Sequence, residues 1–82
     1  MLMIVWDAPK RHTNLAKHGL DFADLDEGFF LASMVVPAKG GRYMAIGRLG
    51  NATVAVVFIP LGNEGVSVIS LRPASEKERS LL

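Results

Sequence analysis

The spacing of hydrophobic residues predicts one strand followed by two helices in the first part of the chain. Residues 1–6 are almost entirely apolar, which is typical of a buried strand. The next segments repeat apolar positions at helical spacing and predict helices from about Ala8 to His18 and from Asp21 to about Leu31. Asp7 is suited to cap the start of the first helix, and Gly19 is suited to end it.

The first predicted helix has two different faces. At about 100° per residue, one face collects Ala8, His12, Leu15 and Ala16. The opposite face is a polar stripe, which consists of Lys10, Arg11, Asn14, Lys17 and His18. We expect the first face to pack against the rest of the molecule and the polar stripe to face solvent.

After Ala32 the pattern changes to short strands separated by turns. The predicted strands are Met34–Pro37, Arg42–Arg48, Thr53–Ile59 and Val66–Leu71. Their close spacing indicates an antiparallel meander, in which the strand with the proline lies at an edge and the strand 53–59 lies centrally, covered on both faces. Ser75 and Glu78 form a capping-box pattern, which predicts that a short helix begins at Glu76.

These elements predict a single α+β domain over residues 1–82, with two helices on a small twisted antiparallel sheet. The order is β-α-α-β-β-β-β, followed by a helical stub. Half of the residues are hydrophobic and 21% are charged, which is typical of a folded chain rather than a disordered one. The longest apolar run, Val54 to Leu61, is too short to span a membrane, and the apolar start lacks the basic leader of a signal peptide. We therefore expect a cytoplasmic protein without a membrane partner.

Charge and residue types narrow the possible chemistry. The chain has no cysteine, which excludes a disulfide framework, a thiolate zinc site and a cysteine nucleophile. His12 and His18 diverge by about 120° around the first helix, so we expect no metal site and no cofactor. Net charge is only +1, but cations and acids are segregated: between Leu31 and Asn63 the only charged residues are Lys39, Arg42 and Arg48.

Several motifs in order along the chain resemble the BrnT family, the ribonuclease toxins of type II toxin–antitoxin pairs. The motifs are Trp6-Asp7, Lys10, Asn14, Lys17-His18-Gly19, Phe22, Phe29-Phe30, Arg42 to Gly47, Val54 to Phe58, Ile69 to Ala74 and Glu78-Arg79. The resemblance covers essentially the whole chain. It implies a RelE-like fold and a ribonuclease activity that arrests translation. It also implies a partner, a BrnA-type antitoxin with a ribbon-helix-helix part. The complex would contact DNA only through this part of the antitoxin. The toxin would form a dimer or a toxin–antitoxin heterotetramer.

Metal-free RNA cleavage needs a group that accepts the 2′-hydroxyl proton, a group that protonates the leaving oxygen, and cations beside the phosphate. The candidate catalytic residues are Arg72, Arg48, His18 and Lys17, and the candidate RNA-binding residues are Arg42, Lys10, Tyr43 and Lys39. We expect the guanidinium groups of Arg42, Arg48 and Arg72 to converge on one pocket. Histidine is the side chain that exchanges protons near neutral pH, which favours His18 as acid or base.

Each candidate also has a purely structural interpretation. Arg72 could pair with Glu76 or Glu78, and His18 could cap the end of its helix. The lysines could belong to a solvated face, and Tyr43 could pack in the core, because it points away from Arg42 in a strand.

Two departures from the family pattern leave other functions open. The chain is less basic than many relatives and has no arginine in the segment before Ile69-Ser70, and the last helix, which is often longer in relatives, stops at Leu82. One alternative is therefore a catalytically weak binding module, which acts mainly as the antitoxin's partner in a DNA-bound repressor complex. Another is a small structural domain that dimerises through a sheet edge.

Overall fold

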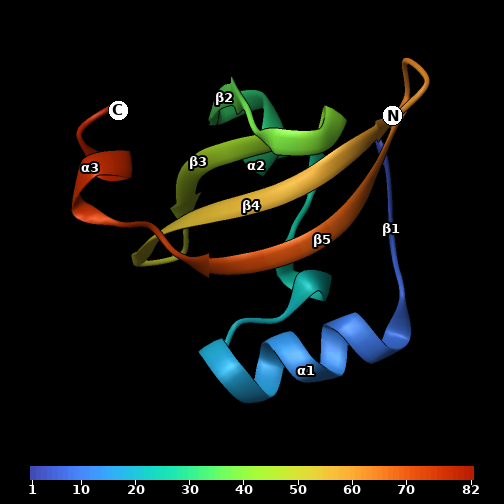
Figure 1. Ribbon diagram of the computed structural model, residues 1–82, viewed down its shortest axis with the longest axis horizontal. Helices are drawn as coiled ribbons and strands as arrows, with labels where there is room; N and C mark the ends of the chain where they lie inside the picture. The colour runs from blue at the N-terminus through green and yellow to red at the C-terminus, as the bar shows by residue number, and fades with distance from the viewer.

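A five-stranded sheet organises the chain (Figure 1). The computed structural model describes all of residues 1–82. The strands are β1 (Met3–Trp6), β2 (Met34–Pro37), β3 (Tyr43–Leu49), β4 (Ala52–Leu61) and β5 (Gly65–Pro73). Their order across the sheet is β1-β5-β4-β3-β2. Strands β2 to β5 form the expected antiparallel meander, whereas β1 pairs with β5 in parallel and makes the sheet mixed. The α+β class and the predicted order of elements are confirmed.

The helical elements are α1 (Ala8–His18), the 3-10 turn η1 (Phe22–Asp24), α2 (Glu27–Ala32), the 3-10 turn η2 (Lys39–Gly41) and α3 (Glu76–Arg79). Helix α1 has the predicted bounds, and Gly19 ends it in the left-handed conformation at φ 68°. The Asp7 carboxylate makes no capping hydrogen bond, contrary to the prediction, and lies instead 3.5 Å from Lys10 Nζ.

The second predicted helix is wrong as one continuous element. It is divided into η1 and α2, because two aspartates each cap a separate start. Asp21 accepts a hydrogen bond from the Ala23 backbone N–H at 3.0 Å, and Asp26 accepts one from the Phe29 N–H at 2.8 Å. A capping aspartate adopts extended backbone angles, so Asp26 interrupts the helical path.

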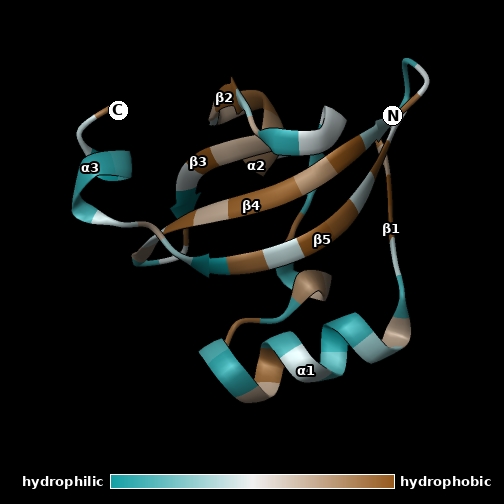
Figure 2. Ribbon diagram, in the orientation of Figure 1, coloured by the Kyte–Doolittle hydropathy of each residue, from teal (hydrophilic) through white to brown (hydrophobic).

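Strand burial agrees with the sequence for β4 and differs for β1. Strand β4 lies in the middle of the sheet, and its residues Val54, Ala55 and Val56 are completely buried, as predicted. Figure 2 shows the hydrophobic character of this strand along most of its length. Strand β1 was predicted to be buried, but it is an edge strand with Met3 and Val5 exposed on one side. Strand β2 is the other edge, as its proline predicts.

The core fills the space between one face of the sheet and the segment that carries η1 and α2. Phe22, Leu25 and Phe29 are buried there against sheet residues that include Val56, Val68 and Leu71. Trp6 packs on the same cluster, with its ring edge-on to that of Phe22. The predicted contribution of the second helical segment to the core is confirmed. None of the helices has the length and apolar composition that crossing a bilayer requires.

Helix α1 turns its polar stripe toward the sheet, which reverses the predicted orientation. Ala8, His12 and Ala16 are exposed, and Leu15 is 39% exposed, whereas Asn14 is only 7% exposed. Figure 2 shows that α1 is mostly hydrophilic. Hydrogen bonds of Asn14 to Leu20 and Leu71, and the ion pair of Arg11 with Asp21, attach this helix, and hydrophobic periodicity alone does not report them.

Candidate functional site

A polar groove lies between α1 and β5. It has a volume of about 330 Å³ and is lined by Pro9, Lys10, Thr13, Asn14, Lys17, His18, Ile69 and Ser70. Lys10, Thr13 and Lys17 follow the helical spacing i, i+3 and i+7, so they lie on one side of α1. The groove therefore gathers three of the predicted site residues, Lys10, Lys17 and His18, beside two hydroxyl groups, those of Thr13 and Ser70.

Asn14 fixes the wall of this groove. Its Nδ2 donates to the Leu71 carbonyl at 2.7 Å, and its Oδ1 accepts from the Leu71 N–H at 3.0 Å. A further hydrogen bond joins Nδ2 to the Leu20 carbonyl at 3.2 Å. Pairing of β1 with β5 ends at Val68, so this edge of β5 has no strand partner at Leu71. The side-chain amide takes that place and holds α1 against the strand.

The groove and Arg72 share one side of the sheet. Ser70 and Arg72 are two residues apart in β5, so both side chains lie on the face opposite the core residue Leu71. Arg72 is paired with Ala55 of β4, which is paired with Ile46 of β3. We call the face of the sheet that carries Arg72, Ala55 and Ile46 the arginine face.

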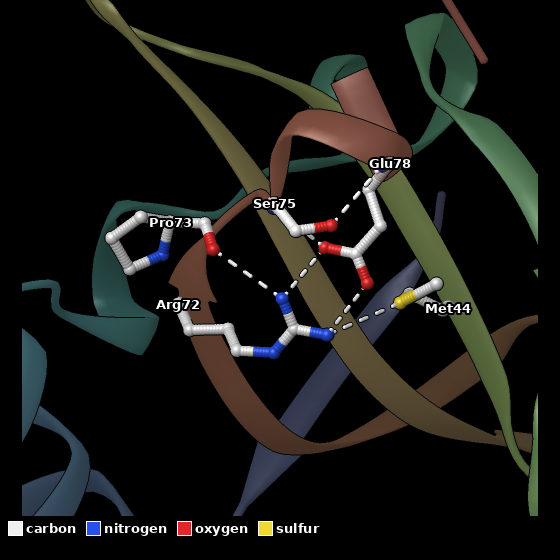
Figure 3. A network of polar contacts seen from close by, with 5 residues as sticks. All are labelled: Met44, Arg72, Pro73, Ser75 and Glu78. Carbon is white, nitrogen blue, oxygen red and sulfur yellow. Dashed lines mark hydrogen bonds and ion pairs between the residues drawn. The ribbon is translucent and has the colours of Figure 1, made fainter. Parts of the chain in front are cut away.

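The side chain of Arg72 crosses β4 on the arginine face (Figure 3). Its Nη2 lies 3.7 Å from Met44 Sδ, on β3, which is two strands away from β5. Its Nη1 lies 3.3 Å from the Pro73 carbonyl oxygen. The guanidinium group is thus held above the middle of the sheet rather than extended into solvent, and its side chain is 33% exposed.

Glu78 binds this guanidinium through both carboxylate oxygens. Nη1 donates to Oε1 at 2.7 Å, and Nη2 donates to Oε2 at 2.8 Å. These hydrogen bonds lower the pKa of Glu78 to about 2 and raise the pKa of Arg72. One structural alternative from the sequence, an ion pair between Arg72 and Glu78, is therefore present in the chain.

The predicted capping box positions Glu78. The Ser75 Oγ accepts from the Glu78 N–H at 3.1 Å, and the Ser75 N–H donates to Glu78 Oε1 at 2.8 Å. These reciprocal bonds begin α3 and direct its only half-buried side chain toward Arg72 (Figure 3).

Arg48 and Arg42 share the arginine face but do not meet Arg72. Each lies an even number of positions from Ile46, so their side chains are on the same face as that of Ile46. Arg42 precedes β3 and continues it by one residue in extended conformation. From strand spacing and rise, the Cα atoms of Arg48 and Arg72 are about 12 Å apart, and those of Arg42 and Arg48 about 20 Å. No arginine lines either cavity of the protein. The expected convergence on one pocket is therefore wrong, because Arg42 and Arg48 occupy opposite ends of one strand.

Two further RNA-binding candidates lie elsewhere. The Tyr43 ring stacks on Phe58, with centroids 6.1 Å apart, and Phe58 belongs to the core cluster. Tyr43 is therefore on the face opposite Arg42, as its strand position predicts, and it is 38% exposed. Lys39 is exposed in η2, outside the groove, and forms no ion pair.

Thr13, Ser70 and Glu78 were not among the predicted site residues, although the sequence contains signals for each. Thr13 lies one helical turn from both Lys10 and Lys17, Ser70 lies two strand positions from Arg72, and Glu78 belongs to the predicted capping box.

The remaining cation of the polar stripe, Arg11, is bound by Asp21 at 2.7 and 2.9 Å. These hydrogen bonds lower the pKa of Asp21 to about 2.

The charges and hydroxyls of the groove suit an anionic ligand. Two ammonium groups can hold phosphate oxygens, hydroxyl groups can hydrogen-bond a ribose, and a histidine can transfer a proton. The second cavity, of about 340 Å³, is lined by seven apolar residues and by Glu27, Glu64 and Asn63, so its acidic side chains would repel a phosphate. No group of three His, Asp or Glu side chains is placed to hold a metal ion.

Comparisons with known proteins agree with this fold. A family model described as the ribonuclease toxin, BrnT, of type II toxin–antitoxin systems matches residues 6–78. The crystal structure of the ribonuclease toxin BrnT of Brucella abortus is 56% identical to this chain, with a TM-score of 0.85, and the match covers 93% of this chain and 100% of that one. None of the curated proteins matches the sequence significantly. On the family match and the structural likeness together, the chain belongs to the BrnT family of ribonuclease toxins of type II toxin–antitoxin systems.

Proposed function

We propose that this toxin is a metal-independent endoribonuclease whose active surface combines the groove between α1 and β5 with the arginine face. One observation carries the proposal: Lys10, Lys17 and His18 line a single groove with Ser70, on the same side of the sheet as Arg72. Family membership supplies the ribonuclease class, and this grouping supplies residues that could perform the reaction.

In the proposed reaction the ribose 2′-oxygen forms a bond to the adjacent phosphorus while the bond from phosphorus to the 5′-oxygen of the next nucleotide breaks, so no nucleophile from the protein is needed. The 2′-hydroxyl loses a proton and the leaving 5′-oxygen gains one. In this proposal His18 performs one of these two transfers and solvent water the other, since imidazole is suited to both roles near neutral pH. Lys17, from the groove, and Arg72, from the arginine face, stabilise the negative charge that develops on the phosphorane oxygens, so in this proposal the scissile phosphate lies over β5, between the two cations. Lys10 binds a neighbouring phosphate. Arg48, a catalytic candidate from the sequence, is about 12 Å from Arg72 between Cα atoms, so in this scheme it binds RNA instead of acting in catalysis. Arg48, Arg42 and Lys39 extend the RNA path along β3 and η2, and Tyr43 contacts RNA only where the path crosses the sheet edge.

A type II toxin family implies an antitoxin protein as partner. We propose that it is of the BrnA type, with a ribbon-helix-helix part that contacts DNA, and that it covers the arginine face in the cytoplasm. Acidic side chains of the antitoxin would match the unpaired cations Lys17 and Arg48. The complex would be a heterotetramer or contain a toxin dimer.

The internal ion pairs favour one alternative function. Arg72 is bound by Glu78 and Arg11 by Asp21, which leaves fewer free cations in a chain whose net charge is only +1. Phosphate contacts dominate nucleic-acid affinity, so fewer free cations mean weaker RNA binding. A catalytically weak chain would act mainly as the antitoxin's partner in a DNA-bound repressor complex.

Cleavage in the presence of EDTA distinguishes the two functions. The purified chain, without antitoxin, should cut a single-stranded RNA and leave 2′,3′-cyclic phosphate and 5′-hydroxyl ends. The matching DNA oligonucleotide, which lacks the 2′-hydroxyl, should stay intact. RNA that remains uncut after long incubation, with or without Mg²⁺, would support the binding module. Cleavage that requires Mg²⁺ would contradict metal independence while leaving the ribonuclease class in place.

A further inference from the structure

We infer that the Glu78 carboxylate occupies the position on Arg72 that an RNA phosphate takes, so that the phosphate binds there only by displacing Glu78. This inference rests on the proposed role of Arg72 as a phosphate-binding residue. It adds an internal competitor, carried by α3, that limits RNA binding by the free toxin.

The first argument is geometric. Arginine binds carboxylates and phosphates in the same bidentate manner, with two parallel N–H···O hydrogen bonds. Glu78 has this geometry, at 2.7 and 2.8 Å from the two terminal nitrogens of Arg72. Its two oxygens therefore stand where two phosphate oxygens would stand.

The second argument concerns the donors that remain. Nη1 also faces the Pro73 carbonyl oxygen, and Nη2 also faces the sulfur of Met44. Of the five N–H groups of Arg72, only the Nε–H has no partner, so the two terminal nitrogens have no second pair of free donors while Glu78 is bound. A phosphate that uses both of these nitrogens must replace the carboxylate.

The third argument is that α3 can move at little cost. It is a single turn of four residues, and Glu76, Lys77 and Arg79 are exposed. The hydrogen bonds that join it to the arginine face come from Glu78, whose side chain is 16% exposed. Segments with few buried apolar contacts open locally without global unfolding. The hydrogen bond from the Glu78 N–H to Ser75 Oγ lies within this turn, so it can persist when the carboxylate leaves Arg72.

The fourth argument is electrostatic. With its pKa lowered to about 2, Glu78 carries a full negative charge at any physiological pH. It therefore neutralises Arg72 in the free chain, as a bound phosphate would. A phosphate that must displace Glu78 therefore binds more weakly than a phosphate at an open site. Its apparent affinity is lowered in proportion to the fraction of time for which Glu78 is away from Arg72.

Glu78→Gln tests this competition while preserving the local fold. Glutamine at the third position of a helix maintains the capping box, but it does not carry the charge that holds Arg72. Glu76→Gln is the matched control, because it gives the same net charge from the same turn, and Glu76 is exposed and forms no ion pair. The probe is a fluorescent 2′-deoxy oligonucleotide, which presents phosphates but has no 2′-hydroxyl to react.

We expect Glu78→Gln to bind the probe roughly fivefold more tightly than Glu76→Gln, which is the magnitude of a favourable exposed ion pair. In an Arg72→Ala background the advantage of Glu78→Gln should disappear. Equal affinities of the two variants, weaker binding by Glu78→Gln, or an advantage that persists without Arg72 would each overturn the inference. Absence of any probe binding would overturn it as well, because the Arg72 fork would then not be a phosphate site.

The cleavage assay separates this inference from the proposed function. If wild-type protein cleaves RNA in EDTA but Glu78→Gln binds the probe no better than its control, the ribonuclease assignment stands and Glu78 is a structural partner of Arg72. If Glu78→Gln binds more tightly but no variant cleaves RNA, the competition stands and the proposed catalysis is wrong.

Discussion

The side-chain amide of Asn14 makes the two hydrogen bonds to Leu71 that a neighbouring β-strand would otherwise make. The contact joins residues 57 positions apart, with distances of 2.7 Å to the Leu71 carbonyl and 3.0 Å to its N–H. It extends the hydrogen bonding of β5 beyond the end of β1, and it connects the groove on α1 to the strand that carries Arg72. The geometry of the proposed active surface therefore depends on one buried amide.

Asn14→Ala should lower the free energy of unfolding by about 2–4 kcal/mol, because it leaves both backbone groups of Leu71 buried without a partner. Urea unfolding followed by circular dichroism measures the change. His12→Ala, an exposed substitution on the same helix, should alter stability by no more than about 0.5 kcal/mol. Equal stabilities of the two variants would show that Asn14 does not hold α1 to the sheet.

Local sequence signals predicted much of this fold. The bounds of α1, the strand positions and the Ser75–Glu78 capping box all depend on residues a few positions apart, and the structure confirms them. The break between η1 and α2 had a local signal as well, since Asp26 is a good helix cap, but the regular spacing of Phe22, Leu25 and Phe29 obscured it.

Long-range pairings could not be predicted from periodicity. Nothing in residues 3–6 specifies that they pair in parallel with β5, so β1 was expected to be buried rather than at an edge. The orientation of α1 depends on Asn14 finding Leu71, and a polar residue carries no hydrophobic signal of its burial. The arginines show the same difference between local and long-range prediction. The sequence correctly indicates that Arg42 and Arg48 lie on one face of the sheet, but their separation along β3 keeps their side chains from meeting Arg72 in one pocket.

Arg72→Ala should lower kcat/KM for RNA by about 100-fold or more, the usual cost of removing a donor that stabilises transition-state charge. Arg72→Lys should lose most of the same factor, because an ammonium group cannot hold two phosphate oxygens in the bidentate geometry. Arg79→Ala is the control, since Arg79 is an exposed arginine on α3 without an ion pair. Relief of growth inhibition on expression should follow the same order as the rates. Full toxicity of Arg72→Ala with an unchanged circular dichroism spectrum would remove Arg72 from the site.

His18→Ala should lower the cleavage rate by about 100-fold or more if the imidazole transfers a proton. The other histidine, His12, is exposed outside the groove, so His12→Ala should retain the wild-type rate. The pH dependence of kcat separates catalysis from helix capping: loss of a proton donor or acceptor removes one limb of the profile, whereas loss of a cap lowers stability and leaves the profile unchanged. An unaltered profile in His18→Ala would assign this residue to the end of α1 alone.

Acid should destabilise the protein through two carboxylates. Asp21 and Glu78 each have a pKa of about 2 in the folded chain, because Arg11 and Arg72 donate hydrogen bonds to them. The unfolded chain takes up these protons first as pH falls, at ordinary carboxyl pKa values near 4. The stabilisation is therefore complete above about pH 5 and is lost progressively between about pH 4.5 and pH 2.

Asp21→Asn and Glu78→Gln should each lower stability at pH 7 and flatten its decline in acid, because the variant no longer has a carboxyl group whose pKa differs between the folded and unfolded states. Urea unfolding at a series of pH values between 7 and 3 measures both effects. Glu64→Gln is the control, since the Glu64 side chain is exposed and forms no hydrogen bond or ion pair. Its stability curve should follow that of the wild type. If Glu78→Gln retained the full acid dependence, the Arg72 pair would not hold α3 in solution, and Arg72 would be free to bind a phosphate without competition.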